Sequence, residues 1–130
     1  MTPTALLLHV AHGFSARPTI DAQLCARSDL SWQVLELELP EVLHREVGAD
    51  VVWASRPRLR DTADLRRCLP GRPLLVSVPR HSAPALVVQH YDAGADLVIE
   101  DEGITYAAAA VATLGRRLQR FAPEAHAVCT

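Results

Sequence analysis

The sequence contains no apolar run near the roughly eighteen residues that a membrane-spanning helix needs. The first four residues are also too few to precede the apolar core of a signal peptide. Both absences predict a cytoplasmic protein that does not use a membrane as a partner.

Cysteine is scarce, and neither sign of charge dominates. The three cysteines, Cys25, Cys68 and Cys129, are isolated and far apart, which fits a reducing compartment and offers no metal-ligand pair. Lysine and arginine number 13 against 15 aspartates and glutamates, a formal net charge of −2. This balance predicts no general attraction to nucleic acid or to anionic membranes.

The chain does contain a regular alternation of short apolar runs and helix signals. Apolar runs at residues 4–10, 32–39, 49–54, 74–78 and 97–100 predict strands, and the clean alternation of 32–39 is typical of a strand near a sheet edge. Helices are expected at 18–28, 40–47, from Asp61 or Thr62 to 69, at 82–92 and at 104–120, with Ser82 as the cap of the fourth. This order predicts one α/β domain, a three-layer, doubly wound parallel sheet of five strands.

Ligands of an open parallel sheet bind beyond the carboxyl ends of its strands. Residues 9–12, 55–56, 78–80 and 100–102 follow or end four of the expected strands. They contribute a mixed set of polar side chains, namely His9, His12, Ser55, Arg56, Arg80 and Asp101.

Three segments in register resemble the receiver domain of response regulators. ADVVWAS resembles its third strand, RPLLVSVPR its fourth, and AGADLVIEDE, followed by an Ala-rich helix ending in GRR, its fifth strand and last helix. The resemblance covers nearly the whole chain and is clearest from residue 49 onward. It implies a flavodoxin-like strand order of 2-1-3-4-5, and is strongest to the amino-terminal domain of OmpR-type transcriptional regulators.

The resemblance implies phosphoryl transfer from a histidine kinase to an aspartate, but the required residues are replaced. The acidic pair that holds Mg²⁺ falls at His9 to His12, the acceptor at Ser55, the strand-four hydroxyl at Val78 and the lysine at Asp101. Hard oxygen ligands for Mg²⁺ are therefore missing. Replacing a lysine about 4 Å from a phosphoryl group by a carboxylate also changes the interaction by several kcal/mol, from attraction to repulsion. We therefore expect a pseudo-receiver that is not phosphorylated, binds no metal or cofactor and is not an enzyme.

The resemblance also implies a role in controlling a DNA-binding output through homodimerisation. In OmpR-type regulators the pairing face consists of helix four, strand five and helix five. The corresponding candidates here are Asp96, Glu100, Tyr106, Arg116 and Arg117, whose opposite charges suit a twofold contact. Residues 1–121 are expected to form the domain and 122–130 an irregular tail or the start of a linker. DNA contact is expected only through an effector domain outside this chain.

Two other interpretations stay open at this stage. The degenerate cleft could bind a polar or anionic metabolite, with Arg56 and Arg80 as donors, or its loops could bond one another, for example His9 with Asp101. A metal site at His9 and His12 has only Asp101 as a third ligand, and Ser55 lacks the glycine-flanked turn of a nucleophile. His81 and His90 are expected on the surface.

Overall fold

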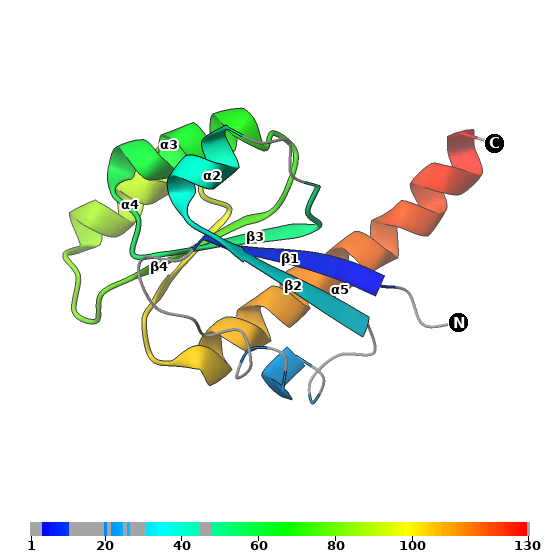
Figure 1. The fold of residues 1–130 in the computed structure, drawn as a ribbon, viewed down its shortest axis with the longest axis horizontal. Coiled ribbons are helices and arrows are strands. Elements are labelled where there is room, and N and C mark those ends of the chain that lie inside the picture. The colour runs from blue at the N-terminus through cyan, green and yellow to red at the C-terminus, as the bar shows by residue number, and fades with distance from the viewer. Residues whose placement is uncertain are drawn as a thin grey trace.

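The computed structural model describes residues 4–10, 20, 22–24, 26, 31–44 and 48–129. Five parallel strands form one sheet in the order β2-β1-β3-β4-β5 (Figure 1). The strands are β1 (Thr4–Val10), β2 (Ser31–Leu37), β3 (Val51–Ser55), β4 (Leu74–Val78) and β5 (Leu97–Glu100). The expected strand order is confirmed, and so is the position of the second strand at an edge.

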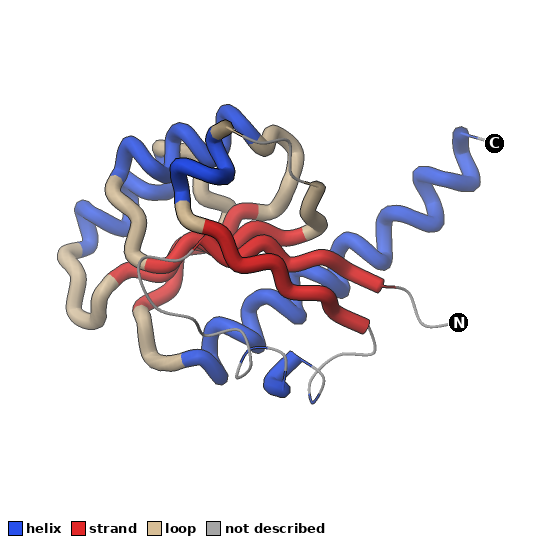
Figure 2. Tube along the Cα trace, in the orientation of Figure 1, coloured by secondary structure: helices blue, strands red, loops and turns tan. Residues whose placement is uncertain are grey.

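Helices cover both faces of this sheet. The helices α2 (Leu39–Leu43), α3 (Leu59–Cys68) and α4 (Pro84–Asp92) lie on one face, and α5 (Ile104–Cys129) lies on the other (Figure 2). Ile20, residues 22–24 and Ala26 are helical, and the rest of the helix expected at 18–28 lies outside the described residues. The three-layer α/β architecture expected from the sequence is therefore the one observed.

Two apolar cores result from the alternation of side chains along the strands. On the α5 side, Leu7, Val51 and Leu75 pack with Leu24 and with Val111 of α5. On the other side, a second set of strand residues packs with residues of α2 and α3: Leu8, Val52, Val76, Val42 and Leu65. The sheet is thus buried on both faces, as the nearly continuous apolar strands indicate.

Two helix starts differ from the expected ones. Helix α3 begins at Leu59 with Arg58 as its N-cap, because the Asp61 carboxylate, three residues on, accepts the backbone N–H of Arg58 at 3.0 Å. Helix α4 has Ala83 as its N-cap. The expectation that Ser82 caps it is wrong, since the Ser82 hydroxyl donates instead to the carbonyl of Pro79 at 2.5 Å.

The last helix is longer than expected. It continues to Cys129, so residues 122–129 are helical where an irregular tail was expected, and Figure 1 shows the carboxyl-terminal part of the helix projecting past the sheet. Within the described part of the chain, no helix combines the length and the apolar character of a membrane span.

Candidate functional site

The carboxyl edge of the sheet is the place where the sequence predicts the functional site. Ser55, the last residue of β3, is buried and lies in register with Ser77 of β4. The backbone turns directly after it, because Arg56 adopts a positive φ of 49° while its N–H donates to the carbonyl of Ser77 at 2.7 Å. This turn directs the Arg56 side chain toward the end of β5.

An ion pair joins the loops after β3 and β5. The Nε and Nη2 atoms of Arg56 each lie 2.9 Å from Oδ2 of Asp101, and the backbone N–H of Asp101 donates to the carbonyl of Val78 at 2.7 Å. The charges are arranged in the opposite way to the receiver pattern, in which an aspartate ends the third strand and a lysine ends the fifth. The negative charge follows β5 and the positive charge follows β3, so the pair connects the same two strands with opposite polarity.

The described residues of this edge do not fit the magnesium ion that receiver chemistry needs. The Asp101 carboxylate already pairs with Arg56, and no group of three metal-ligating side chains occurs within the described ranges. The whole sequence also contains no lysine, since all 13 of its basic residues are arginines. A lysine from another position therefore cannot replace the missing one.

His9 lies in the core of the sheet instead of at its edge. Its side chain is fully buried, stacks on the Trp53 ring with centroids 4.0 Å apart, and places Nδ1 2.9 Å from Oε2 of Glu36. The interpretation that it bonds Asp101 is wrong. His12 lies outside the described residues, so the structure does not show whether the two histidines approach each other.

The other residues expected in the cleft do not lie together either. Val78 is buried on the face covered by α3, where it belongs to the apolar core. Arg80 is exposed beyond the end of β4. Ser77 points into the interior, where its hydroxyl accepts the indole N–H of Trp53 at 3.0 Å. Of the predicted cleft, the structure therefore brings together Arg56 and Asp101 beside the buried Ser55.

The candidate residues of the dimer face divide into two groups. Tyr106 is 54% exposed and Glu100 is partly buried on β5. At the opposite end of β5, the Asp96 carboxylate lies 2.5 Å from Nη2 of Arg66 and accepts the Leu74 N–H at 2.8 Å. Arg117 lines a pocket together with Asp96. Asp96 is therefore already engaged within its own chain.

Asp96 has a structural role as part of a tripeptide that occurs twice in the chain. This role was not predicted from the sequence. Gly-Ala-Asp occurs at 48–50 and again at 94–96, each time directly before a strand. In both copies the aspartate exchanges two hydrogen bonds with one residue of the neighbouring strand, Asp50 with Leu6 of β1 and Asp96 with Leu74 of β4, at 2.8 to 2.9 Å. The repetition in the sequence was the signal that could have revealed a structural role for this motif.

His90 is another departure from expectation. It is 1% exposed, where the sequence suggested a surface position, and its Nδ1 lies 2.9 Å from the Thr62 hydroxyl of α3. Burial lowers the pKa of His90 below its ordinary value of 6.5 because the charged imidazolium loses its hydration. The neutral ring joins α4 to α3.

Comparison with known proteins identifies the fold. No protein-family model matches the chain, and no curated protein matches it in sequence. Solved structures do match. An orphan response regulator of H. pylori superposes with a TM-score of 0.67 at 19% identity, over 88% of this chain and 98% of that one. A LuxR-family DNA-binding response regulator from Silicibacter pomeroyi gives 0.69 at 16% identity, over 85% and 90%.

A third structure is an atypical orphan response regulator with a phosphorylation-independent regulatory mechanism. It matches with a TM-score of 0.63 at 20% identity, over 85% of this chain and 95% of that one. At these identities the likeness establishes a shared fold. This chain has the fold of response-regulator receiver domains, and the proteins that share it are regulatory proteins, orphan and atypical members among them.

Proposed function

We propose that this chain is a phosphorylation-independent, receiver-like regulatory domain of an atypical response regulator, acting in the cytoplasm. The observation that carries the proposal is the Arg56–Asp101 ion pair beside Ser55 at the carboxyl edge. A serine occupies the acceptor position, and the carboxylate that replaces the lysine is held by an arginine. Communication then depends on association between surfaces instead of covalent modification.

The charges at this edge oppose a phosphoryl group. The attacking group in phosphoryl transfer needs neighbouring cations that neutralise the phosphoryl oxygens. Here the only cation placed next to the acceptor position by the described contacts is Arg56, and its charge is already offset by Asp101. A serine hydroxyl without a general base is also a weak nucleophile.

Intact-mass measurement after incubation with acetyl phosphate and Mg²⁺ tests the proposal. We expect the mass of the wild type to stay unchanged. A stoichiometric gain of one phosphoryl group that disappears in Ser55→Ala would contradict the proposal. The Ser82→Ala variant serves as the matched control, because it removes a hydroxyl at the same edge but outside the acceptor position.

We further propose homodimerisation through α4, β5 and α5. Supporting it, the large exposed apolar side chains in the described ranges all lie on α4 and α5: Val88 is 56% exposed, Tyr91 41% and Tyr106 54%. The Tyr91 hydroxyl accepts the Val98 N–H at 3.1 Å on β5. Apolar residues on neighbouring elements favour a twofold contact, with Glu100 and Arg116 as candidate charged partners at its rim.

Sedimentation velocity of Tyr106→Glu tests this contact. A buried charge without a partner is costly, so we expect the dimer dissociation constant to rise at least about tenfold, equivalent to about 1.4 kcal/mol. Arg116→Glu should have a smaller effect at the rim. Arg80→Glu is the control, since Arg80 is exposed beyond β4. Unchanged association of Tyr106→Glu would remove this face from consideration.

The output of such a dimer would be DNA binding through an effector domain outside these 130 residues. The neighbours that are LuxR-family DNA-binding response regulators support this assignment. The division into a domain at 1–121 and a linker from 122 remains a prediction, and α5 runs across that boundary as one helix. A projecting helix is a suitable connection, because it transmits a change of orientation at the dimer face to whatever follows it.

The alternative, a metabolite sensor in the degenerate cleft, also remains a prediction. Both proposed donors are exposed, but Arg56 is engaged by Asp101 and Arg80 lies beyond the end of β4. A ligand there would have to compete with the ion pair. The geometry therefore favours the dimerisation proposal over a sensor at this edge.

A further inference from the structure

Two contacts, one helical turn apart, join α3 to the end of α4. At the first, Oγ1 of Thr62 lies 2.9 Å from Nδ1 of His90, and both side chains are buried. At the second, Nε of Arg66 donates to the carbonyl of Gly94 at 2.8 Å. The contacting residues are four apart on α3 and four apart at the end of α4, and residues at this spacing lie on the same side of a helix. One face of α3 therefore holds α4 at two successive turns.

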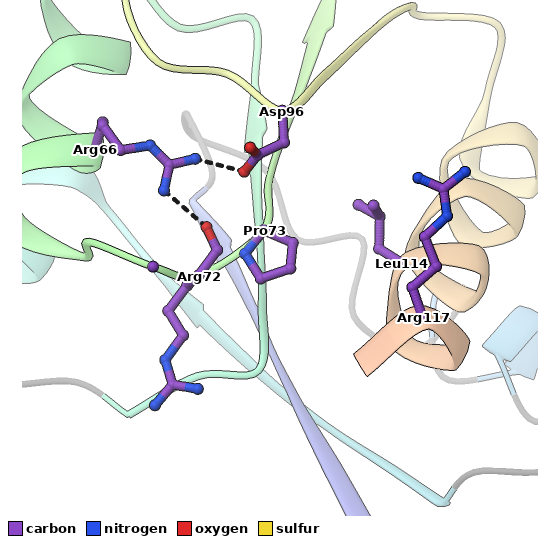
Figure 3. Close-up of a pocket in the computed structure, with 7 residues that line it drawn as sticks. Arg66, Arg72, Pro73, Asp96, Leu114 and Arg117 are labelled. Carbon is purple, nitrogen blue, oxygen red and sulfur yellow. Dashed lines mark hydrogen bonds and ion pairs between the residues drawn. The ribbon is translucent and has the colours of Figure 1, made fainter. Parts of the chain in front are cut away.

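Arg66 also fixes the turn between α4 and β5. Its guanidinium donates to the carbonyl of Arg72 at 2.9 Å and to the Asp96 carboxylate at 2.5 Å, and Figure 3, a view of the pocket that these residues line, shows both bonds. The Arg66 side chain lies directly over Gly94, where a Cβ atom would approach its Cγ to 2.6 Å. A cation at the carboxyl end of a helix also interacts favourably with the helix dipole. Displacing this turn would therefore break the bonds of one guanidinium to three separate groups.

The helix held in this way carries part of the proposed dimer face. Val88 and Tyr91, the exposed apolar residues of α4, lie on either side of His90 in the sequence. The turn that Arg66 holds connects α4 to β5, the next element of that face. The position of the α4 side chains relative to Tyr106 on α5 therefore depends on how α3 holds α4.

We propose that Arg66 and Thr62 are positioning residues of the dimer face, which set the orientation of α4 for contact with a second copy of the chain. The inference rests on the dimerisation proposed above and adds to it two residues of α3, outside the three elements of the face. In a twofold contact the same patch is used on both copies, so a rotation of α4 displaces Val88 and Tyr91 on both sides at once. Loss of the Arg66 bonds therefore weakens association without any substitution on the face itself.

Arg66→Met tests the positioning role in the full chain, because methionine keeps an unbranched apolar stem and removes every donor. Residual dipolar couplings of the backbone amides, measured on dilute labelled protein, report the orientation of α4 relative to the sheet. We expect the couplings of α4 to change while those of β1 and β3 stay. We also expect the dimer dissociation constant from sedimentation velocity to rise at least about threefold. Thr62→Val, which removes the hydroxyl bonded to His90, should act in the same direction.

Two control variants separate positioning from a general loss of stability. Arg67→Met changes the next residue of α3, whose guanidinium pairs with Asp64 of the same helix, and should leave α4 and the dimer unchanged. Val34→Ala lowers stability through a cavity at β2, on the opposite edge of the sheet from β5, and should also leave both unchanged. Arg66→Lys keeps a cation that can donate to the Asp96 carboxylate, and should recover part of the association lost in Arg66→Met.

The proposal would be overturned if the α4 couplings of Arg66→Met matched those of the wild type, or if Val34→Ala weakened association as much. It would also be overturned if Arg66→Met associated as the wild type does while Tyr106→Glu did not. Failure of the dimer face itself is distinguishable, because Tyr106→Glu would then associate as the wild type does. The couplings would in that case still decide whether α3 sets the orientation of α4.

Discussion

The two edges of the sheet each carry an arginine–aspartate pair, and the pairs differ in their surroundings. At the carboxyl edge, Arg56 and Asp101 meet with side chains 59% and 31% exposed. At the amino edge, Arg66 is 25% and Asp96 51% exposed, but both partners also bond backbone groups, those of Gly94, Arg72 and Leu74. Exposed ion pairs contribute little to stability, whereas unpaired backbone groups at a strand start are costly. We therefore expect the pair at the amino edge to stabilise the fold more than the pair at the carboxyl edge does.

The largest expected effect comes from Gly94 at the amino edge. Its φ of +122° disfavours a side chain, and a Cβ would lie 2.6 Å from Cγ of Arg66. We expect Gly94→Ala to lower the free energy of unfolding in urea by about 2–4 kcal/mol. Gly71→Ala, at φ +77° with open space around it, should lose only about 1 kcal/mol. Equal losses would mean that the contact with Arg66 does not matter.

Removing the two aspartates compares the edges directly. Asp96→Ala leaves the Leu74 N–H and the Arg66 guanidinium without their carboxylate, and should reduce the free energy of unfolding by about 1–3 kcal/mol. Asp101→Ala breaks a mostly exposed pair and should cost less than about 1 kcal/mol. Denaturant unfolding at low and high salt measures both. If Asp101→Ala proved the more damaging variant, the proposed difference between the edges would be reversed.

His90 gives the smallest expected effect, visible only as a dependence on pH. Because burial lowers its pKa below 6.5, the folded chain binds this proton more weakly than the unfolded chain does. Its contribution to stability is complete above about pH 6.5 and is lost as the pH falls below that value toward the folded pKa. His90→Gln should therefore lose less stability than wild type between about pH 7.5 and 5.5, by up to about 1.4 kcal/mol per pH unit.

The exposed His81 supplies the control for this measurement. His81→Gln makes the same replacement at an exposed position and controls for the loss of a histidine side chain as such. Parallel curves for His90→Gln and wild type would show that burial does not lower the pKa of His90.

Most of the fold could be predicted because burial on both faces dictates the strands. The run at 74–78 and the run at 97–100 coincide with β4 and β5, and the alternating segment after Ser31 is indeed at an edge. Helix termini were less predictable, since a cap depends on which side chain reaches a free N–H. Ser82 bonds a loop carbonyl instead, and Asp61 acts from the third position of its helix.

The candidate site was predicted in its charges but not in its contacts. Aligning the sequence with the receiver pattern was enough to assign Ser55 to the acceptor position and Asp101 to the lysine position. The partner of Asp101 could not be predicted, because it depends on the left-handed turn at Arg56. His9 was expected at the edge because it lies one residue before the end of the first strand, where the acidic pair of the receiver pattern falls. Its pairing with Glu36 depends on the register of β1 with β2, which only the folded sheet defines.

The most direct test of the central claim is to add Mg²⁺ and beryllofluoride to the labelled chain and follow the amide shifts of Ser55, Arg56 and Asp101. If the carboxyl edge cannot hold a metal ion and a phosphoryl group, these three amides should stay at their positions in the free protein. Saturable shifts centred on them, dependent on both additives, would show a working acceptor site and contradict the account.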